Sequence, residues 1–334
     1  MSKVVRLLPS ELEFTVQEGQ TILEGALFNQ VSLEYSCSKG QCGQCKAELL
    51  SGVVASSDFS EDVGLSEREI LTCSSIPKSD ITLNATYFPE LLDIERKTIP
   101  VKVDQFILVN KDVLMITFRF APNSKFNFLP GQFVDLNFSG EKRSYSIANA
   151  DAVNHKIDLH IKRVEGGLFS EHLFNDLKQN QLFRIYGPLG TFFLRDNDSP
   201  LIFMCTGTGF APVKSMVEHL IDRSSKRKIY IYWGGRTSED LYSDLPVQWS
   251  EQYSNIEYIP VLSREQNDAK KLDVSKLPES KYVQHKVVEQ HNDLECFDVY
   301  ACGSEQMIHD AKKLLIQHGL NTEKFYSDAF LPSN

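Results

Sequence analysis

The sequence predicts a multidomain protein in which three domains follow one another along 334 residues. We expect a small α+β domain at residues 1–90, an antiparallel β-barrel at 98–197, and an α/β domain with a parallel sheet at 198–334. Three observations indicate this order. A cysteine-rich loop lies in the first segment, turn-separated strands fill the second, and strands alternate with helical segments in the third. A chain of this length suits two or three compact domains.

The first segment combines patterns typical of a hairpin and a helix. Apolar alternation in VVRLLPSELEFTV predicts a β-hairpin over 4–16, and ILEGALFNQ, at 22–30, has helical spacing. A further short strand, ITLNATYF, is expected to complete an α+β unit of the β-grasp type. Residues 86–99 lie around Pro89 and end before Pro100, so we expect a connector with few core positions.

The chemistry of this segment rests on four cysteines, which are Cys37, Cys42, Cys45 and Cys73. They are separated by 4, 2 and 27 residues, so three thiols come from one tight loop. This spacing is typical of a plant-type [2Fe–2S] cluster, in which four thiolates hold two bridged irons. Gly40 and Gly43 would let the backbone curl close to the sulfides. The alternative is zinc, whose ribbons and fingers usually take their ligands from two short pairs. The sequence therefore favours an iron–sulfur cluster.

The second segment has the strand pattern of an antiparallel barrel. VKVDQFILV, VLMITFRF, QFVDLNF and KIDLHIKRV are separated by Gly, Pro and Asn turns, and one helix is expected at about 169–177. After a turn, Arg143, Tyr145 and Ser146 end a strand. An arginine fork can bind a pyrophosphate, a tyrosine can stack on a flat ring, and a serine can bond to a ring nitrogen.

A second motif of this segment opens the expected helix. Its residues Gly166, Gly167 and Ser170 offer a hydroxyl and free N–H groups at a helix N-terminus, where phosphate binds readily. Each motif alone is weak, because an Arg and a Tyr occur together in many strands and Gly-Gly is more often a simple turn.

The third segment begins with the strand PLIFMC, followed by a glycine loop and the helix APVKSMVEHLI. The residues of the loop that we expect to bind a nucleotide are Thr206, Gly207, Thr208, Gly209 and Pro212. A strand, a glycine loop and a helix together present a pyrophosphate to a helix N-terminus. KIYIYWG, IEYIPVLS and CFDVYAC are further buried-strand candidates, and the alternation predicts a parallel sheet with helices on both faces.

In this order, the motifs resemble the ferredoxin–NADP reductase superfamily, preceded by a plant-type ferredoxin domain. The resemblance covers the whole chain and includes GPLGTF at 187–192 and the Gly-Phe-Ala-Pro variant of the glycine loop. It implies FAD held by the second segment and a pyridine nucleotide held by the third. It places Cys302 and Gly303 against the nicotinamide and Phe330 over the flavin. Ser146, Cys302 and Asp328 are then the expected catalytic residues.

The resemblance also indicates where the coenzyme is selected. Arg264, after the strand YIPVLS, stands where the superfamily reads an adenosine 2′-phosphate, and Lys270 and Lys271 follow closely. A solvated charge is the alternative for Arg264. The resemblance implies NADH as the coenzyme, and an arginine at this place leaves NADPH possible.

Several stretches are similar to a narrower group of these reductases: SYSIANAD, FAPVKSMVEHLI, IYIYWGG, LPVQWSEQ, DVYACGSEQMI and FYSDAF. That group supplies electrons to a pyridoxamine-phosphate CDP-6-deoxy-hexulose 3-dehydrase in 3,6-dideoxyhexose (O-antigen) biosynthesis. A reductase component of an aromatic-ring dioxygenase or multicomponent monooxygenase would use the same cofactors with another protein acceptor. A ferredoxin-like carrier or sensor is disfavoured by the flavin and nucleotide motifs.

Composition and charge exclude other classes. Hydrophobic residues make up 42% of the chain, but no apolar run reaches the length of a membrane span, and the N-terminal residues lack a signal-peptide core. The remaining cysteines are few and scattered, so we expect a reducing cytoplasmic location. The net charge of −10 argues against nucleic acid. Residues 1–97 hold 15 acidic and 8 basic residues, which serve either solubility or the steering of a basic partner.

Overall fold

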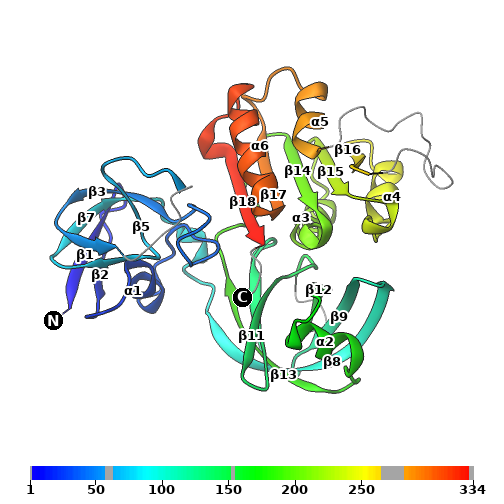
Figure 1. Cartoon of the computed structure of the whole chain (residues 1–334), viewed down its shortest axis with the longest axis horizontal. Helices are drawn as coiled ribbons and strands as arrows, with labels where there is room; N and C mark the ends of the chain where they lie inside the picture. The colour runs from blue at the N-terminus through cyan, green and yellow to red at the C-terminus, as the bar shows by residue number, and fades with distance from the viewer. Residues whose placement is uncertain (1, 57–62, 152–154, 265–281, 331–334) are drawn as a thin grey trace. The chain divides into compact units, whose positions relative to one another are not determined.

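A computed structural model describes residues 2–56, 63–151, 155–264 and 282–330 of the chain. The chain divides into two compact units, Met1–Glu95 and Arg96–Asn334 (Figure 1). The first unit holds the cysteine loop, and the second holds the flavin and nucleotide motifs. None of the helices in the described ranges is long and apolar enough to cross a membrane.

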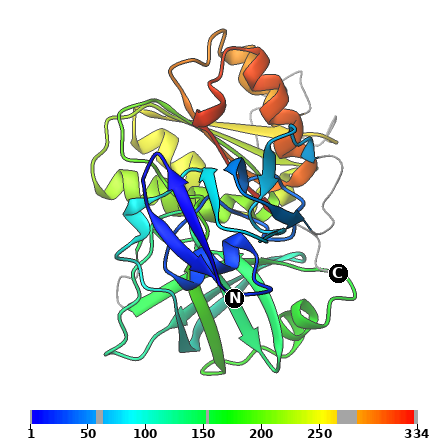
Figure 2. The same cartoon turned by 90° about the vertical axis from the view of Figure 1, so that its left-hand side faces the viewer.

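The first unit is built on a mixed sheet of order β2-β1-β7-β3-β5, whose first strands are the deep-blue hairpin of Figure 2. β1 pairs antiparallel with β2 and parallel with β7. Strands β4 and β6, which fall between β3 and β7 in the chain, form a separate short antiparallel pair. The strands are β1 Lys3–Leu8, β2 Glu13–Val16, β3 Lys46–Ser51, β4 Val54–Ser56, β5 Glu69–Leu71, β6 Ser75–Pro77 and β7 Ile81–Asn84.

Helix α1, Ile22–Phe28, packs against this sheet and leads into the cysteine loop. Thr21 and Glu24 form a capping box, which satisfies N–H groups at the start of the helix. Gly25 lies so close to β2 that an added Cβ would be 2.5 Å from a methyl group of Val16. The expected hairpin and helix are thus confirmed, and they set the start of the loop that follows.

The expected connector at 86–99 is wrong in part. Phe88 and Leu91 are buried, with Leu91 in a short 3-10 helix at Pro89–Leu91, and strand β8 already begins at Lys97. Apolar side chains in this stretch fill core positions of the first unit, so little of it is left to act as a link.

The second unit begins with a six-stranded antiparallel sheet of order β11-β10-β13-β8-β9-β12. An isolated bridge between Ile147 and Leu159 joins the two ends of that order, so the sheet closes on itself. Its interior is apolar and includes an edge-to-face pair of Phe118 and Phe183, with centroids 5.4 Å apart. The elements are β8 Lys97–Asn110, β9 Val113–Arg119, β10 Phe133–Phe138, β11 Glu141–Ser146, β12 Lys156–Lys162, α2 Leu168–Asn175 and β13 Leu182–Leu189.

The rest of the second unit is an α/β layer structure around a parallel sheet of order β16-β15-β14-β17-β18 (Figure 1). All four strand pairings are parallel, as the strand–helix alternation predicts. The strands are β14 Leu201–Thr206, β15 Ile229–Gly235, β16 Ile256–Leu262, β17 Asp298–Ser304 and β18 Phe325–Phe330. The helices are α3 Phe210–Asp222, α4 Leu245–Gln252, α5 Val283–Gln290 and α6 Glu305–Gln317.

Helices cover both faces of this sheet, because successive strand side chains point to opposite sides. On β14, Phe203 and Cys205 pack with α3 and α4, whereas Ile202 and Met204 pack with α5 and α6. Because all these strands are parallel, their carboxyl ends meet along one edge of the sheet. In open parallel sheets, ligands bind at that edge.

Candidate functional site

The cysteine loop brings four thiols together in two pairs. Cys37 contacts Cys42, and the sulfurs of Cys45 and Cys73 lie 3.1 Å apart. Three of these residues follow α1, and Cys73 comes two residues after β5. Electrostatic interactions also link Cys42 with Cys45 and Cys37 with Cys73. All four thiols therefore converge on one place in the first unit.

The backbone of the loop is arranged around these sulfurs. The N–H of Gly40 donates to Cys73 Sγ at 3.2 Å, and the N–H of Cys42 donates to Cys37 Sγ at 3.4 Å. Gly40 and Gly43 adopt φ angles of +71° and +72°, which L-residues rarely adopt. Hydrogen bonds, first from the partner thiol of each pair, lower the pKa of Cys37 and of Cys73. The same hydrogen bonds, and then burial, raise the pKa of the other member of each pair, Cys42 and Cys45. The loop thus favours one thiolate in each pair, and the thiolate is the form that binds iron.

This donor set fits a [2Fe–2S] cluster. Four thiols in two pairs give two sulfur ligands for each of two irons, and the N–H groups are in place to bond to sulfur. Among the described residues, no three or more His, Cys, Asp or Glu side chains are arranged to hold a single metal ion.

The flavin motif lies on β11. Tyr145 is half-buried, and its ring lies 6.4 Å from that of Phe169 at the start of α2. Arg143 donates to Glu141 Oε2 at 3.2 Å and to the carbonyl of Lys142 at 2.7 Å. Its guanidinium is therefore held at the outer part of the hairpin, about a third exposed, where an anion can reach it.

The glycine turn before α2 is stabilised by its own serine. Ser170 Oγ accepts from the N–H of Val164 at 3.1 Å and lies within hydrogen-bond distance of the carbonyls of Val164 and Gly167. Gly166 has a φ of +74°. The hydroxyl that the sequence offered as a phosphate contact thus also shapes the turn that carries Gly166 and Gly167.

The nucleotide loop, which we define as residues 206–212, runs from the end of β14 into α3. Gly207 has a φ of +52°, and its carbonyl accepts a hydrogen bond from Trp233 Nε1 at 3.2 Å. Gly209 touches the neighbouring strand, since an added Cβ would lie 2.3 Å from the carbonyl oxygen of Cys302. Thr208 is buried in the loop, and Pro212 lies in the first turn of α3.

The three expected catalytic residues lie close together at the carboxyl end of the parallel sheet. Cys302 on β17 pairs in register with Asp328 on β18, and Ser146 Oγ donates to Asp328 Oδ2 at 3.5 Å. Burial first, and then Asp328, raise the pKa of the Cys302 thiol, which is fully buried. The hydrogen bond between Ser146 and Asp328 joins the flavin strand β11 to the nucleotide sheet. Gly303 follows with a φ of +147°, and Phe330, half-buried, pairs in register with Ser304.

Comparisons with known proteins agree with this geometry. Three family models match the chain: a 2Fe-2S iron-sulfur cluster binding domain at 5–78, an oxidoreductase FAD-binding domain at 100–194, and an oxidoreductase NAD-binding domain at 203–313. Protein RfbI of Salmonella typhimurium is 46% identical over 334 residues, which cover 100% of this chain and 98% of that protein. The chain belongs to the ferredoxin–NADP reductase family.

Other relatives of the reductase also match along the whole chain. The CDP-6-deoxy-L-threo-D-glycero-4-hexulose-3-dehydrase reductase of Yersinia pseudotuberculosis is 45% identical over 335 residues, covering 100% of both chains. A terephthalate 1,2-dioxygenase reductase component from Comamonas sp is 30% identical, covering 100% of this chain and 98% of that one. Among solved structures, the Amycolatopsis cytochrome P450 reductase GcoB superposes with a TM-score of 0.79 at 25% identity, covering 99% of both chains. The protein is thus an oxidoreductase with ferredoxin, FAD-binding and NAD-binding domains.

Sequence reasoning missed one charged residue that lies beside Arg264. Arg264 follows β16, as expected, and is exposed; its N–H donates to the carbonyl of Arg236 at 3.0 Å. Arg236, also exposed, follows the neighbouring strand β15. Only the pairing of these two strands reveals that two arginines end side by side. Lys270 and Lys271 lie outside the described residues.

Proposed function

We propose that this reductase passes electrons from NAD(P)H through FAD and a [2Fe–2S] cluster to a pyridoxamine-phosphate CDP-6-deoxy-hexulose 3-dehydrase, in the synthesis of a 3,6-dideoxyhexose. One observation carries the choice of acceptor. The full-length relative bearing the dehydrase reductase name is 45% identical, whereas the dioxygenase reductase component is 30% identical. A cytoplasmic location follows from this role, and Cys205, Cys296 and Cys302 are free thiols, as a reducing compartment favours.

The proposed division of labour follows the domains, with boundaries at 1–90, 98–197 and 198–334. Bound FAD can take two electrons together from a nicotinamide and release them singly to a one-electron centre. We assign Arg143 to the flavin pyrophosphate and Tyr145 to the ring. Ser146 and Asp328, joined by their hydrogen bond, would orient the flavin edge next to Cys302. Because Cys302 is uncharged and fully buried, we propose that it lies beneath the place of the nicotinamide and exchanges no proton with it.

Testing the acceptor requires the dehydrase itself. The purified reductase, loaded with FAD and cluster, is mixed with the dehydrase, its nucleotide-sugar substrate and NADH. We expect NADH oxidation that depends on the dehydrase and yields the 3-deoxy sugar. Cytochrome c reduction in a parallel assay shows whether the reductase is active. An active reductase that transfers nothing to the dehydrase, but supports an aromatic-ring dioxygenase, would refute this acceptor and favour the alternative.

We further propose NADH as the preferred coenzyme, with measurable use of NADPH through Arg264 and Arg236. A charge-assisted hydrogen bond to a 2′-phosphate contributes roughly 1.5–3 kcal/mol, which is about ten- to a hundredfold in affinity. Arg264→Ala is therefore expected to lower kcat/KM for NADPH and to spare NADH. Arg236→Ala should act in the same direction, since both residues end neighbouring strands. Equal losses with both coenzymes would show that Arg264 does not read the phosphate.

A further inference from the structure

The carbonyl of Gly207 is held by a tryptophan that cannot easily move. Trp233 donates to it through Nε1 at 3.2 Å. The indole stacks on Phe210 with centroids 4.1 Å apart and an interplanar angle of 14°. Tyr242 meets it edge-on at 5.0 Å and 89°. Rotation of the indole would displace both neighbouring rings, so the hydrogen bond to the nucleotide loop has a fixed direction.

Tyr242, the third ring of this group, is hydrogen-bonded to a residue of the flavin domain. The hydroxyl of Tyr242 hydrogen-bonds to Nδ1 of His160 at 2.9 Å. His160 belongs to β12 of the antiparallel sheet and is 5% exposed. Burial, and then the charge of Lys214, lower the pKa of His160 to about 3, so the imidazole is neutral at ordinary pH. A neutral imidazole and a phenol form one directed hydrogen bond here, where two apolar side chains would pack without direction.

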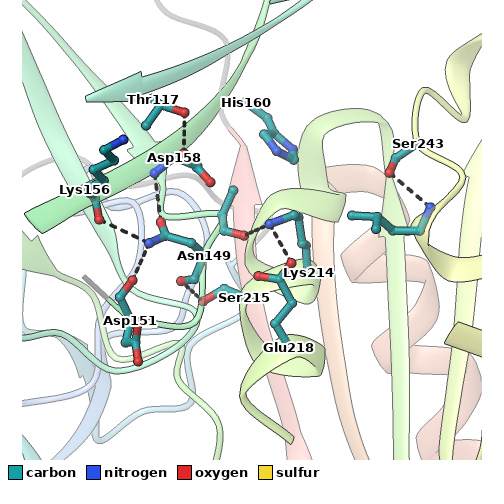
Figure 3. Close-up of polar contacts among 12 residues, drawn as sticks. Thr117, Asn149, Asp151, Lys156, Asp158, His160, Lys214, Ser215, Glu218 and Ser243 are labelled. Carbon is teal, nitrogen blue, oxygen red and sulfur yellow. Dashed lines mark hydrogen bonds and ion pairs between the residues drawn. The ribbon is translucent and has the colours of Figure 1, made fainter. Parts of the chain in front are cut away.

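A second set of contacts ties helix α3 to the segment that follows β11 (Figure 3). Lys214 Nζ donates to the carbonyl of Ala148 at 3.0 Å, and Ser215 Oγ donates to the carbonyl of Asn149 at 2.8 Å. Both donors lie on α3, directly after the nucleotide loop, and both carbonyls follow the flavin strand β11. The start of α3 therefore keeps its place on the flavin domain even if the His160–Tyr242 bond is lost. Removal of that bond should then affect the loop more than the packing of the domains.

We infer that His160 is a positioning residue for the pyridine nucleotide, which fixes the Gly207 carbonyl, and so the shape of the nucleotide loop, through Tyr242 and Trp233. The inference rests on the proposed role of that loop in binding NAD(P)H. A glycine at a φ of +52° has many alternative conformations open to it, so an anchored carbonyl selects one of them. In this way a flavin-domain residue sets the place of the hydride donor.

The fold supplies a matched control on the opposite face of the same strand. Tyr232 precedes Trp233 on β15, and its hydroxyl bonds to Gln290 Oε1 at 2.5 Å and to His291 Nε2 at 2.9 Å. Tyr232 packs with the helices on the side away from Phe210. Tyr232→Phe and Tyr242→Phe thus each remove one hydroxyl that pairs with a histidine, but only the second hydroxyl is linked to the loop.

The test is flavin reduction by NADH and by NADPH in the full-length protein loaded with FAD and cluster, followed by stopped-flow absorbance. Tyr242→Phe and His160→Leu should raise the half-saturating coenzyme concentration about three- to tenfold, the size of one lost neutral hydrogen bond. FAD content should not change. His160→Asn, which keeps a polar atom near the position of Nδ1, should recover most of the loss. Tyr232→Phe should leave the half-saturating concentration unchanged.

The outcomes separate the two ideas. If NAD(P)H fails to reduce the wild-type flavin, the proposed function is wrong. If the wild type is reduced and Tyr242→Phe matches Tyr232→Phe, the proposed function stands and the positioning role of His160 is refuted. Should His160→Leu lose FAD on purification, Tyr242→Phe decides, because it removes a single oxygen atom.

Discussion

Gly209 offers a sharp test of the nucleotide loop, because its substitution changes space and little else. Its φ of −58° and ψ of −12° suit any residue, so alanine brings no backbone strain. The added Cβ, however, would lie 2.3 Å from the carbonyl oxygen and 2.8 Å from the carbonyl carbon of Cys302. Both are backbone atoms of a central strand and cannot rotate away. To restore an ordinary contact of 3.4 Å, the loop must move from β17 by about 1 Å.

A displacement of this size should impair hydride transfer far more than folding. Reacting atoms must approach within a narrow range, and a misplacement of about 1 Å can cost on the order of a hundredfold in rate. We therefore expect Gly209→Ala to lower the limiting rate of flavin reduction by about that factor, with FAD content unchanged. Stopped-flow bleaching at saturating NADH measures it.

The control is a glycine of the same layer structure whose added Cβ would come no closer than 4.0 Å to a backbone atom, but whose own backbone is unusual. Gly319 follows α6 with a φ of +90°, and the nearest atom to an added Cβ is 3.3 Å away. Gly319→Ala should reduce stability by about 1 kcal/mol and leave the rate alone. If Gly209→Ala reduces its flavin at the wild-type rate, close packing of the loop on Cys302 does not set the transfer geometry, and our reasoning fails.

Three further predictions concern the other parts of the molecule. Cys73→Ser should disturb the cluster's EPR signal but leave flavin bleaching by NADH intact, since ligands and flavin residues lie in different compact units; loss of bleaching in FAD-loaded protein would contradict this. Arg143→Ala should weaken FAD binding about ten- to a hundredfold, measured by equilibrium dialysis. Lys214→Met leaves Glu218, 2.8 Å from Lys214 in the wild type, without its ion pair. It should lower the melting temperature by roughly 4–8 °C, for a loss of about 2 kcal/mol. Lys214→Met/Glu218→Gln should recover part of that loss.

The pH dependence of the Lys214 variant follows from the carboxyl it leaves behind. Burial raises the pKa of Glu218 in the folded protein, and Lys214 opposes that shift. A carboxyl whose pKa is raised by folding contributes stability below its unfolded pKa and loses it as the pH rises through the folded pKa. The deficit of Lys214→Met should therefore be large at pH 7 and shrink toward pH 4.

The features that the sequence predicted best are those whose physics is local. Three cysteines at fixed intervals and the glycines between them specify one loop, which Cys73 joins from the segment after β5. The strand, glycine loop and helix at 201–222 likewise carry their own pattern. Strand β13 was missed, because LFRIYGPL includes Arg184 and a Gly-Pro pair, and its place in the sheet is set by β8 and β10, which are distant in sequence.

The residues that sequence reasoning missed act through tertiary contacts. Arg236 gains its importance from Arg264 on the next strand, and His160 from Tyr242, which is 82 residues away. Neither Arg236 nor His160 belongs to a motif that the sequence analysis identified. A buried neutral histidine cannot be told from a solvated one without the structure. The role of such residues is therefore open to inference only once the strands and their neighbours are in place.

The same distinction explains why each cofactor could be predicted from a single motif, whereas the electron acceptor could be predicted only from a resemblance spread over many stretches of the chain. A cluster, a flavin and a nucleotide each bind to a short loop with demanding backbone geometry, so a short motif can indicate each of them. A protein acceptor is recognised by a surface, whose residues are scattered along the chain and face no such constraint. The difference between 45% and 30% full-length identity therefore carries information about the acceptor that no single motif holds. The dehydrase assay is accordingly the experiment on which the assignment of this reductase depends.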